Sequence, residues 1–72
     1  MPFANIKVIE GVFTDIEKRQ MIEKVTEVLV TIEGERLRDK TLVIIEETRS
    51  GDWGIGGMSV TTEHAKHLRA GR

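Results

Sequence analysis

The chain has 72 residues and no cysteine, with 11 basic against 12 acidic side chains. So short a chain buries only about 60% of its unfolded surface as a monomer, and without disulfides or thiolate-bound metal its usual means of stabilisation is oligomerisation. The balanced charge offers no positive field for nucleic acid or anionic lipid, and no signal peptide or apolar run of roughly 20 residues is visible. We expect a soluble cytoplasmic protein, one domain over residues 1–72, that binds neither nucleic acid nor membrane and self-associates.

The first predicted element is a strand over residues 2–9. Ala4, Ile6 and Val8 alternate there with polar side chains, which is the period of a strand with one buried face. Gly11 then breaks the pattern, so we expect the strand to end before it.

A helix is predicted next. Thr14 and Glu17 have the spacing of a capping box, which would start the helix at Asp15. Apolar residues then recur at steps of three and four, which indicates a helix that covers a sheet. Gly34 is placed to end the helix. The apolar stripe consists of Met21, Ile22, Val25, Val28, Leu29 and Ile32.

The second half of the chain contains a second strand and a glycine-rich turn. After a polar connection at 35–40, the run 41–45 is apolar and rich in β-branched side chains, as in a strand covered on both faces. Residues 51–57 predict a turn or short hairpin, with a small edge strand at 58–60. Residues 61–72 are predicted to be a C-terminal tail.

Strand, helix and strand in this order make a βαβ unit with parallel strands and a right-handed crossover. The expected fold class is therefore α/β, a βαβ unit followed by a short C-terminal hairpin. Two strands and one helix do not enclose a core. We expect another copy of the chain to supply the missing half.

Most familiar catalytic patterns are missing. His64 and His67 lie three residues apart without a nearby cysteine or an HExxH pattern, so no metal site is predicted. The glycines at 54–57 lack the Lys-Ser/Thr of a phosphate loop. Ser50 and Ser59 have no base at a recognisable spacing. We expect neither metal nor cofactor.

Pro2, the one proline of the chain, has two interpretations. Proline is tolerated at the first residue of a strand, where its missing N–H costs no ladder hydrogen bond. Alternatively, removal of Met1 would leave Pro2 with a secondary amine. An apolar site disfavours the ammonium form and so lowers the pKa of such an amine, which makes it a base near neutral pH. The residues considered for that apolar wall are Phe3, Ile6, Trp53 and Ile55.

Three features together resemble the 4-oxalocrotonate tautomerases: an initial proline, a Glu-Gly pair that ends the first strand, and an aromatic residue before GIGG. These features are Pro2, Glu10 with Gly11, and Trp53, and the match runs in order to about Val60. The resemblance implies a βαβ subunit and dimers that pair into a four-stranded sheet with two helices. It also implies a homohexamer, built as a trimer of dimers.

The resemblance also implies a function, which is a tautomerase that needs no cofactor. Pro2 would be the general base that moves a proton along a conjugated 2-hydroxydienoate or 2-oxoenoate. Trp53, with Ile55 beside it, would form the apolar wall of the substrate site. The expected ligand is a small unsaturated carboxylic acid.

Two family arginines that hold substrate are replaced, by Val12 after the Glu-Gly pair and by Leu42 in the second strand. Arginine binds carboxylates through paired, charge-assisted hydrogen bonds. We therefore expect an altered preference, for an acid with one carboxylate. Other cations near the site are candidates for the missing role, namely Arg36, Arg38, Lys40 and Arg49.

Two alternatives remain open from the sequence. In a hydratase or dehalogenase acting on unsaturated acids, the protonated amine is an acid and a carboxylate activates water. The second alternative is a non-catalytic oligomeric binding protein, which retention of Met1 would favour, since an acylated nitrogen is not a base. The carboxylates considered for the first alternative are Glu10, Glu46, Glu47 and Asp52.

Overall fold

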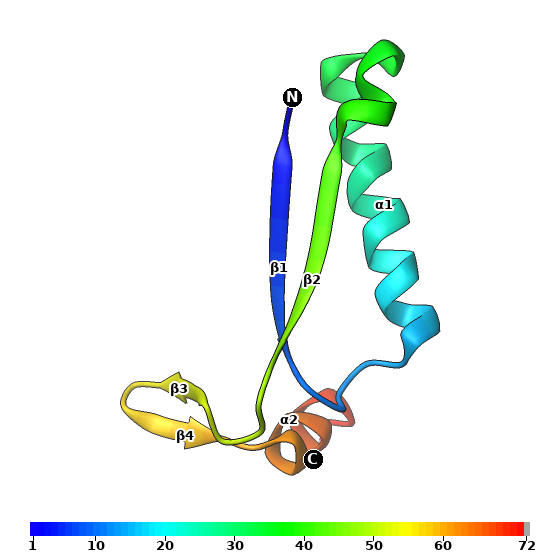
Figure 1. The fold of residues 1–72 in the computed structure, drawn as a ribbon. Coiled ribbons are helices and arrows are strands. Elements are labelled where there is room, and N and C mark those ends of the chain that lie inside the picture. Colours follow the sequence, from blue (N-terminus) through cyan, green and yellow to red (C-terminus); the bar gives the residue numbers. More distant parts are fainter. Residues whose placement is uncertain (72) are drawn as a thin grey trace.

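The computed structural model describes residues 1–71, and its main unit is a strand, a helix and a parallel strand (Figure 1). Strand β1 (Phe3–Ile9) pairs with β2 (Leu42–Thr48), and helix α1 (Asp15–Glu33) connects them. The register runs from Phe3 opposite Leu42 to Ile9 opposite Thr48. The predicted parallel βαβ unit is confirmed.

Helix α1 begins where the capping box predicted. The Thr14 hydroxyl accepts a hydrogen bond from the Glu17 amide at 3.1 Å, and the Glu17 carboxylate accepts one from the Thr14 amide at 3.0 Å. Gly34 ends the helix with its amide on the Val30 carbonyl at 2.9 Å and a φ of 103°, a conformation that a β-carbon disfavours. A 3₁₀ helix, η1 (Glu35–Lys40), then leads into β2.

The glycine-rich segment forms the predicted short hairpin. Strand β3 (Trp53–Ile55) pairs antiparallel with β4 (Met58–Val60), and Trp53 lies opposite Val60. Gly56 and Gly57 connect the strands with φ values of 58° and 82°. Two consecutive positive φ angles are the requirement of a two-residue hairpin turn that matches the strand twist.

The C-terminal segment differs from the tail that was predicted, because helix α2 (Thr62–Arg69) forms there. The Thr61 hydroxyl caps it by accepting from the His64 amide at 3.2 Å. The Thr62 hydroxyl donates to the Glu10 carbonyl at 2.6 Å. An eight-residue helix is marginal by itself, so contacts with distant residues such as Glu10 stabilise it.

The predicted stripe of α1 is only partly covered by the sheet. Within the stripe, the half-buried residues are Met21, Ile22, Val25 and Leu29. Val30, which the stripe did not include, is buried. Val28 and Ile32, however, are 59% and 82% exposed. Four of the six predicted positions are thus half-buried in a single chain, while Val28 and Ile32 are left uncovered.

The sheet itself is covered on one face. Alternate residues of both strands are half-buried or buried beneath α1. On the opposite face Phe3 is 58% exposed, Leu42 56% and Ile44 40%. The expectation that the second strand is covered on both faces is therefore not met within one chain. In residues 1–71 the buried apolar side chains are Val8, Ile9, Val30 and Val60.

Replacing Thr14 by alanine should destabilise the protein by about 1 kcal/mol, because the amide of the first helical turn loses its acceptor. Thermal unfolding measures this at a fixed protein concentration, because any self-association would make Tm depend on concentration. Thr31→Ala is the matched control. Its hydroxyl donates to the Val28 carbonyl in the exposed interior of the same helix, and alanine is favourable there. Equal unfolding temperatures for the two variants would contradict the role of the cap.

Candidate active site

Pro2 lies directly before β1, at the end of the sheet where β2 begins (Figure 1). Its side chain is half-buried, and its carbonyl accepts a hydrogen bond from the Leu42 amide at 3.2 Å. Phe3 and Leu42 are register partners on the open face of the sheet. The backbone of Pro2 is therefore held by the strand pairing, and its neighbours Phe3 and Leu42 are apolar.

Trp53 and Ile55 lie at the other end of β1, in an apolar hollow of about 450 Å³. This volume is within the range of small-molecule sites. The hollow is formed by the end of β1, the loop after it, the hairpin and α2. Its lining residues are Lys7, Val8, Ile9, Val12, Phe13, Trp53, Ile55, Val60, Ala65, Leu68 and Arg69.

One chain does not bring Pro2 and Trp53 together. Strand β1 has seven residues between them, and at about 3.3 Å per residue it separates its ends by roughly 20 Å. Figure 1 shows the N-terminus at one end of β1 and the hairpin at the other. Of the four residues considered for the wall around Pro2, Phe3 lies next to it, whereas Trp53 and Ile55 lie at the far end.

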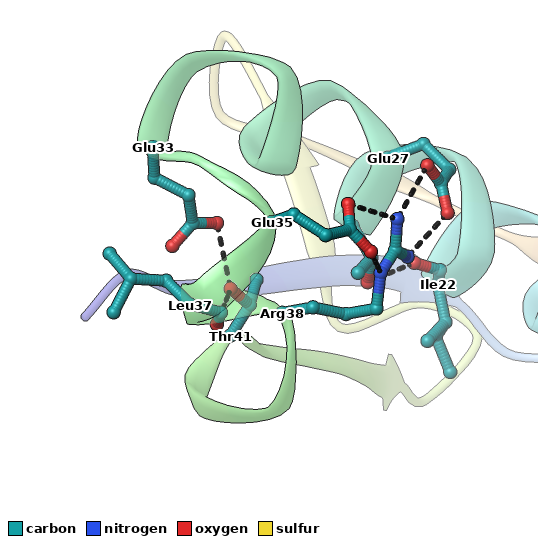
Figure 2. A network of polar contacts seen from close by, with 8 residues as sticks. Ile22, Glu27, Glu33, Glu35, Leu37, Arg38 and Thr41 are labelled. Carbon is teal, nitrogen blue, oxygen red and sulfur yellow. Dashed lines mark hydrogen bonds and ion pairs between the residues drawn. The ribbon is translucent and has the colours of Figure 1, made fainter.

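Three of the four candidate cations belong to η1, near the Pro2 end, and Arg38 among them is fully engaged. Its Nε and Nη2 donate to the Glu35 carboxylate at 2.7 and 3.1 Å, while Nη1 and Nη2 donate to Glu27 (Figure 2). These hydrogen bonds hold the pKa of both carboxyls below the usual range and raise the pKa of Arg38. Both edges of this guanidinium are occupied by carboxylates.

Arg36, Lys40 and Arg49 are exposed, and none of them forms an ion pair within residues 1–71. Arg36 and Lys40 lie in η1, while Arg49 follows β2 at the hairpin end. The four predicted cations are thus divided between the two ends of the sheet.

A fifth cation, Arg69 of α2, was not among the predicted site residues. It donates to the Val12 carbonyl at 3.1 Å and to both carboxylate oxygens of Glu17, and its guanidinium lies 4.8 Å from the centre of the Phe13 ring. Val12 is 57 residues away in the chain. The sequence signal that was available is the Thr61 cap with apolar side chains three and four residues apart after it, which predicts a short helix.

Arg69 governs the titration of Glu17. Its hydrogen bonds, followed by the Thr14 amide, lower the pKa of Glu17 to about 2. A depressed carboxyl pKa stabilises the fold above the unfolded value, and that contribution is lost as the pH falls from about 4.5 towards 2.

Arg69→Gln should therefore move the pKa of Glu17 up towards 4.5. Carboxyl chemical shifts followed by NMR between pH 2 and pH 6 measure it. The pKa of Glu35 is the internal control, because Arg38 holds that carboxyl and not Arg69. An unchanged titration of Glu17 in the variant would contradict the pairing.

The histidines and serines that the sequence analysis set aside lie around α2. His64 and His67 border a second hollow of about 410 Å³ with Glu63 and Leu68. Residues 1–71 contain no group of three side chains arranged to hold a metal ion. Ser50 accepts a hydrogen bond from the Thr62 amide at 2.9 Å and so supports the start of the helix.

The sequence of this chain is similar to those of known tautomerases. The family model described as "Tautomerase enzyme" matches residues 2–63. The protein named "Probable tautomerase K2" from Dickeya dadantii is 44% identical over 61 residues, which cover 85% of this chain and 90% of that protein. A 2-hydroxymuconate tautomerase from Pseudomonas putida is 42% identical over 59 residues, with 82% of this chain and 90% of the relative covered.

The fold of this chain also resembles that of solved tautomerase structures. A 4-oxalocrotonate tautomerase isozyme from Methylibium petroleiphilum superposes with a TM-score of 0.72 at 41% identity, over 81% of this chain and 90% of that one. No helix in residues 1–71 has the length and apolar character to cross a membrane. The resemblance inferred from the sequence is confirmed, and the chain belongs to the tautomerase family.

Proposed function

We propose that the chain is a tautomerase that interconverts the enol and keto forms of a small unsaturated carboxylic acid without a cofactor, with the amine of Pro2 as general base. The observation that carries the proposal is the position of Pro2, half-buried and fixed at the start of β1 in a chain of the tautomerase family. The relative from Pseudomonas putida is a 2-hydroxymuconate tautomerase, which supports a conjugated hydroxy acid as the substrate class.

The chemistry needs one proton to move. After removal of Met1, the neutral amine of Pro2 takes the proton of the enol hydroxyl, and the oxygen becomes a carbonyl. The ammonium then returns the proton to a carbon of the conjugated chain, which restores the free base. Phe3 and Leu42 adjoin Pro2 with apolar side chains, and an apolar site disfavours the ammonium form of an amine.

The arrangement supports a site shared between copies of the chain. A base at one end of β1 and an aromatic wall at the other act on one small molecule only if they come from different subunits. The open face with Phe3, Leu42 and Ile44, and the uncovered helix side with Val28 and Ile32, are apolar surfaces suited to subunit contacts. We therefore retain the proposal of dimers with a four-stranded sheet and two helices, assembled into a homohexamer.

The substrate is proposed to carry one carboxylate. Leu42 is apolar and lies next to Pro2, and Val12 lines the hollow with Trp53. Neither side chain offers a donor to a second carboxylate, which is costly to bury without one.

A hydratase or dehalogenase mechanism has less support from the contacts. Glu46 accepts from Asn5 and Lys7, and Glu47 accepts from Lys18 at 3.1 Å. Glu10 accepts from the Ser50 amide at 3.0 Å. Three of the four carboxylates considered for activating water thus have donors within the chain.

Pro2→Ala should keep the fold and lower enol–keto conversion of phenylenolpyruvate by roughly 10²- to 10⁴-fold, the range of general-base catalysis. A primary amine at the new terminus accounts for residual activity. Ultraviolet absorbance follows the conversion, and intact mass verifies that Met1 is absent from both proteins. Equal rates for wild type and Pro2→Ala would mean that Pro2 only begins the strand and is not the base.

Subunit mixing tests the shared site. Pro2→Ala and Trp53→Ala subunits, each poorly active alone, are unfolded, mixed in equal amounts and refolded, and sedimentation verifies a multimer. Random assembly pairs an intact Pro2 with an intact Trp53 in about one quarter of the sites, so activity should rise to that fraction of wild type. If both residues acted from the same chain, the mixture would gain nothing.

A further inference from the structure

The hollow around Trp53 is lined by charged side chains of one sign, which is positive. Its lining is mostly apolar, and the two charged side chains in it are cations, Lys7 and Arg69. Within residues 1–71 no Asp or Glu lines it. Such a lining suits a ligand with an apolar body and one negative group.

Lys7 and Arg69 differ in how far their N–H groups are already used by acceptors in the chain. Lys7 already forms an ion pair with Glu46 at 3.2 Å on the open face of the sheet. Arg69 uses Nη1 for Val12 and Glu17 and one N–H of Nη2 for Glu17. Its Nε–H has no acceptor within residues 1–71, nor has the second N–H of Nη2. These two groups form the side edge of the guanidinium, which binds a carboxylate through two parallel hydrogen bonds.

Arg38 shows in the same molecule that one guanidinium can serve two carboxylates. Its end edge holds Glu27, and its side edge, Nε with Nη2, holds Glu35. Arg69 has the same end-edge contact with Glu17 and a vacant side edge. Glu17 therefore does not prevent a second carboxylate from binding. Together with the Phe13 ring it fixes the guanidinium before the ligand arrives.

We propose that Arg69 binds the carboxylate of an unsaturated monocarboxylic acid whose apolar chain lies in the hollow against Trp53 and Ile55. This inference rests on the proposed tautomerase function, because it identifies the cation that holds its substrate. The acid would be oriented by Arg69 of one subunit towards Pro2 of another. Arg69 is thereby a substrate-binding residue contributed by α2.

Fluorescence of Trp53, the single tryptophan of the chain, measures binding without turnover. The probes are trans-cinnamate and its neutral analogue cinnamamide. Wild type should bind cinnamate at least about tenfold more tightly than cinnamamide. Arg69→Gln should weaken cinnamate binding by about 10- to 100-fold, the range for a charged hydrogen-bonded pair, and leave cinnamamide unchanged. Arg19→Gln, which removes an exposed cation of α1 that is not among the candidate site residues, should change neither.

A second variant separates binding from folding of α2. Glu17→Gln breaks the same ion pair and so loosens α2 to a similar degree, but it removes the negative charge that competes with the ligand. We expect it to keep or strengthen the preference for cinnamate. If Glu17→Gln and Arg69→Gln lost that preference together, Arg69 would be only an anchor of α2.

Two other results would overturn the proposal: absence of cinnamate binding by wild type, or equal binding by wild type and Arg69→Gln. A failure of the proposed tautomerase function would give a different result from either of these two. If Pro2→Ala converted phenylenolpyruvate as fast as wild type while Arg69→Gln still lost its preference for cinnamate, the proposed function would fail and the role of Arg69 would stand. Binding therefore reports on Arg69, and the turnover of Pro2→Ala reports on the base.

Discussion

The parallel pairing of β1 with β2 is the constraint on which the rest of this structure depends. A parallel connection needs a crossover, so α1 lies on one face of the sheet and leaves the other open. That open face carries Phe3, Leu42 and Ile44 in solvent. Within residues 1–71, β3, β4 and α2 leave these side chains exposed. The proposed assembly would therefore cover the apolar face that folding of one chain leaves open.

The same pairing sets the geometry of the chemistry. Because β1 is straight and hydrogen-bonded along its length, Pro2 and the hollow around Trp53 are held at a fixed separation. Under the proposed function, each subunit presents a base at one end and a binding wall at the other. A site built from two such ends is complete only in an assembly, and its precision comes from strands rather than from flexible loops.

Arg38 and Arg69 are the same residue type, but they differ in how many carboxylates their guanidinium groups contact. Arg38 donates from both edges to Glu27 and Glu35, whereas Arg69 donates from one edge to Glu17 and has no acceptor for the other within residues 1–71. An arginine with both edges occupied stabilises the junction of α1 with η1 (Figure 2). One with a free edge beside an apolar hollow is available for recognition.

The sequence by itself determined the elements whose signals are local: the alternation of β1, the capping box at Thr14, the turn at Gly56 and Gly57, and the motifs around Pro2 that identify the family. Each depends on residues within a few positions of one another. The tertiary structure alone decided which side of α1 the narrow sheet covers. It also brought Arg69 to Val12 and set Pro2 apart from Trp53. Those outcomes depend on contacts between residues tens of positions apart. Periodicity and motif spacing carry no information on such contacts.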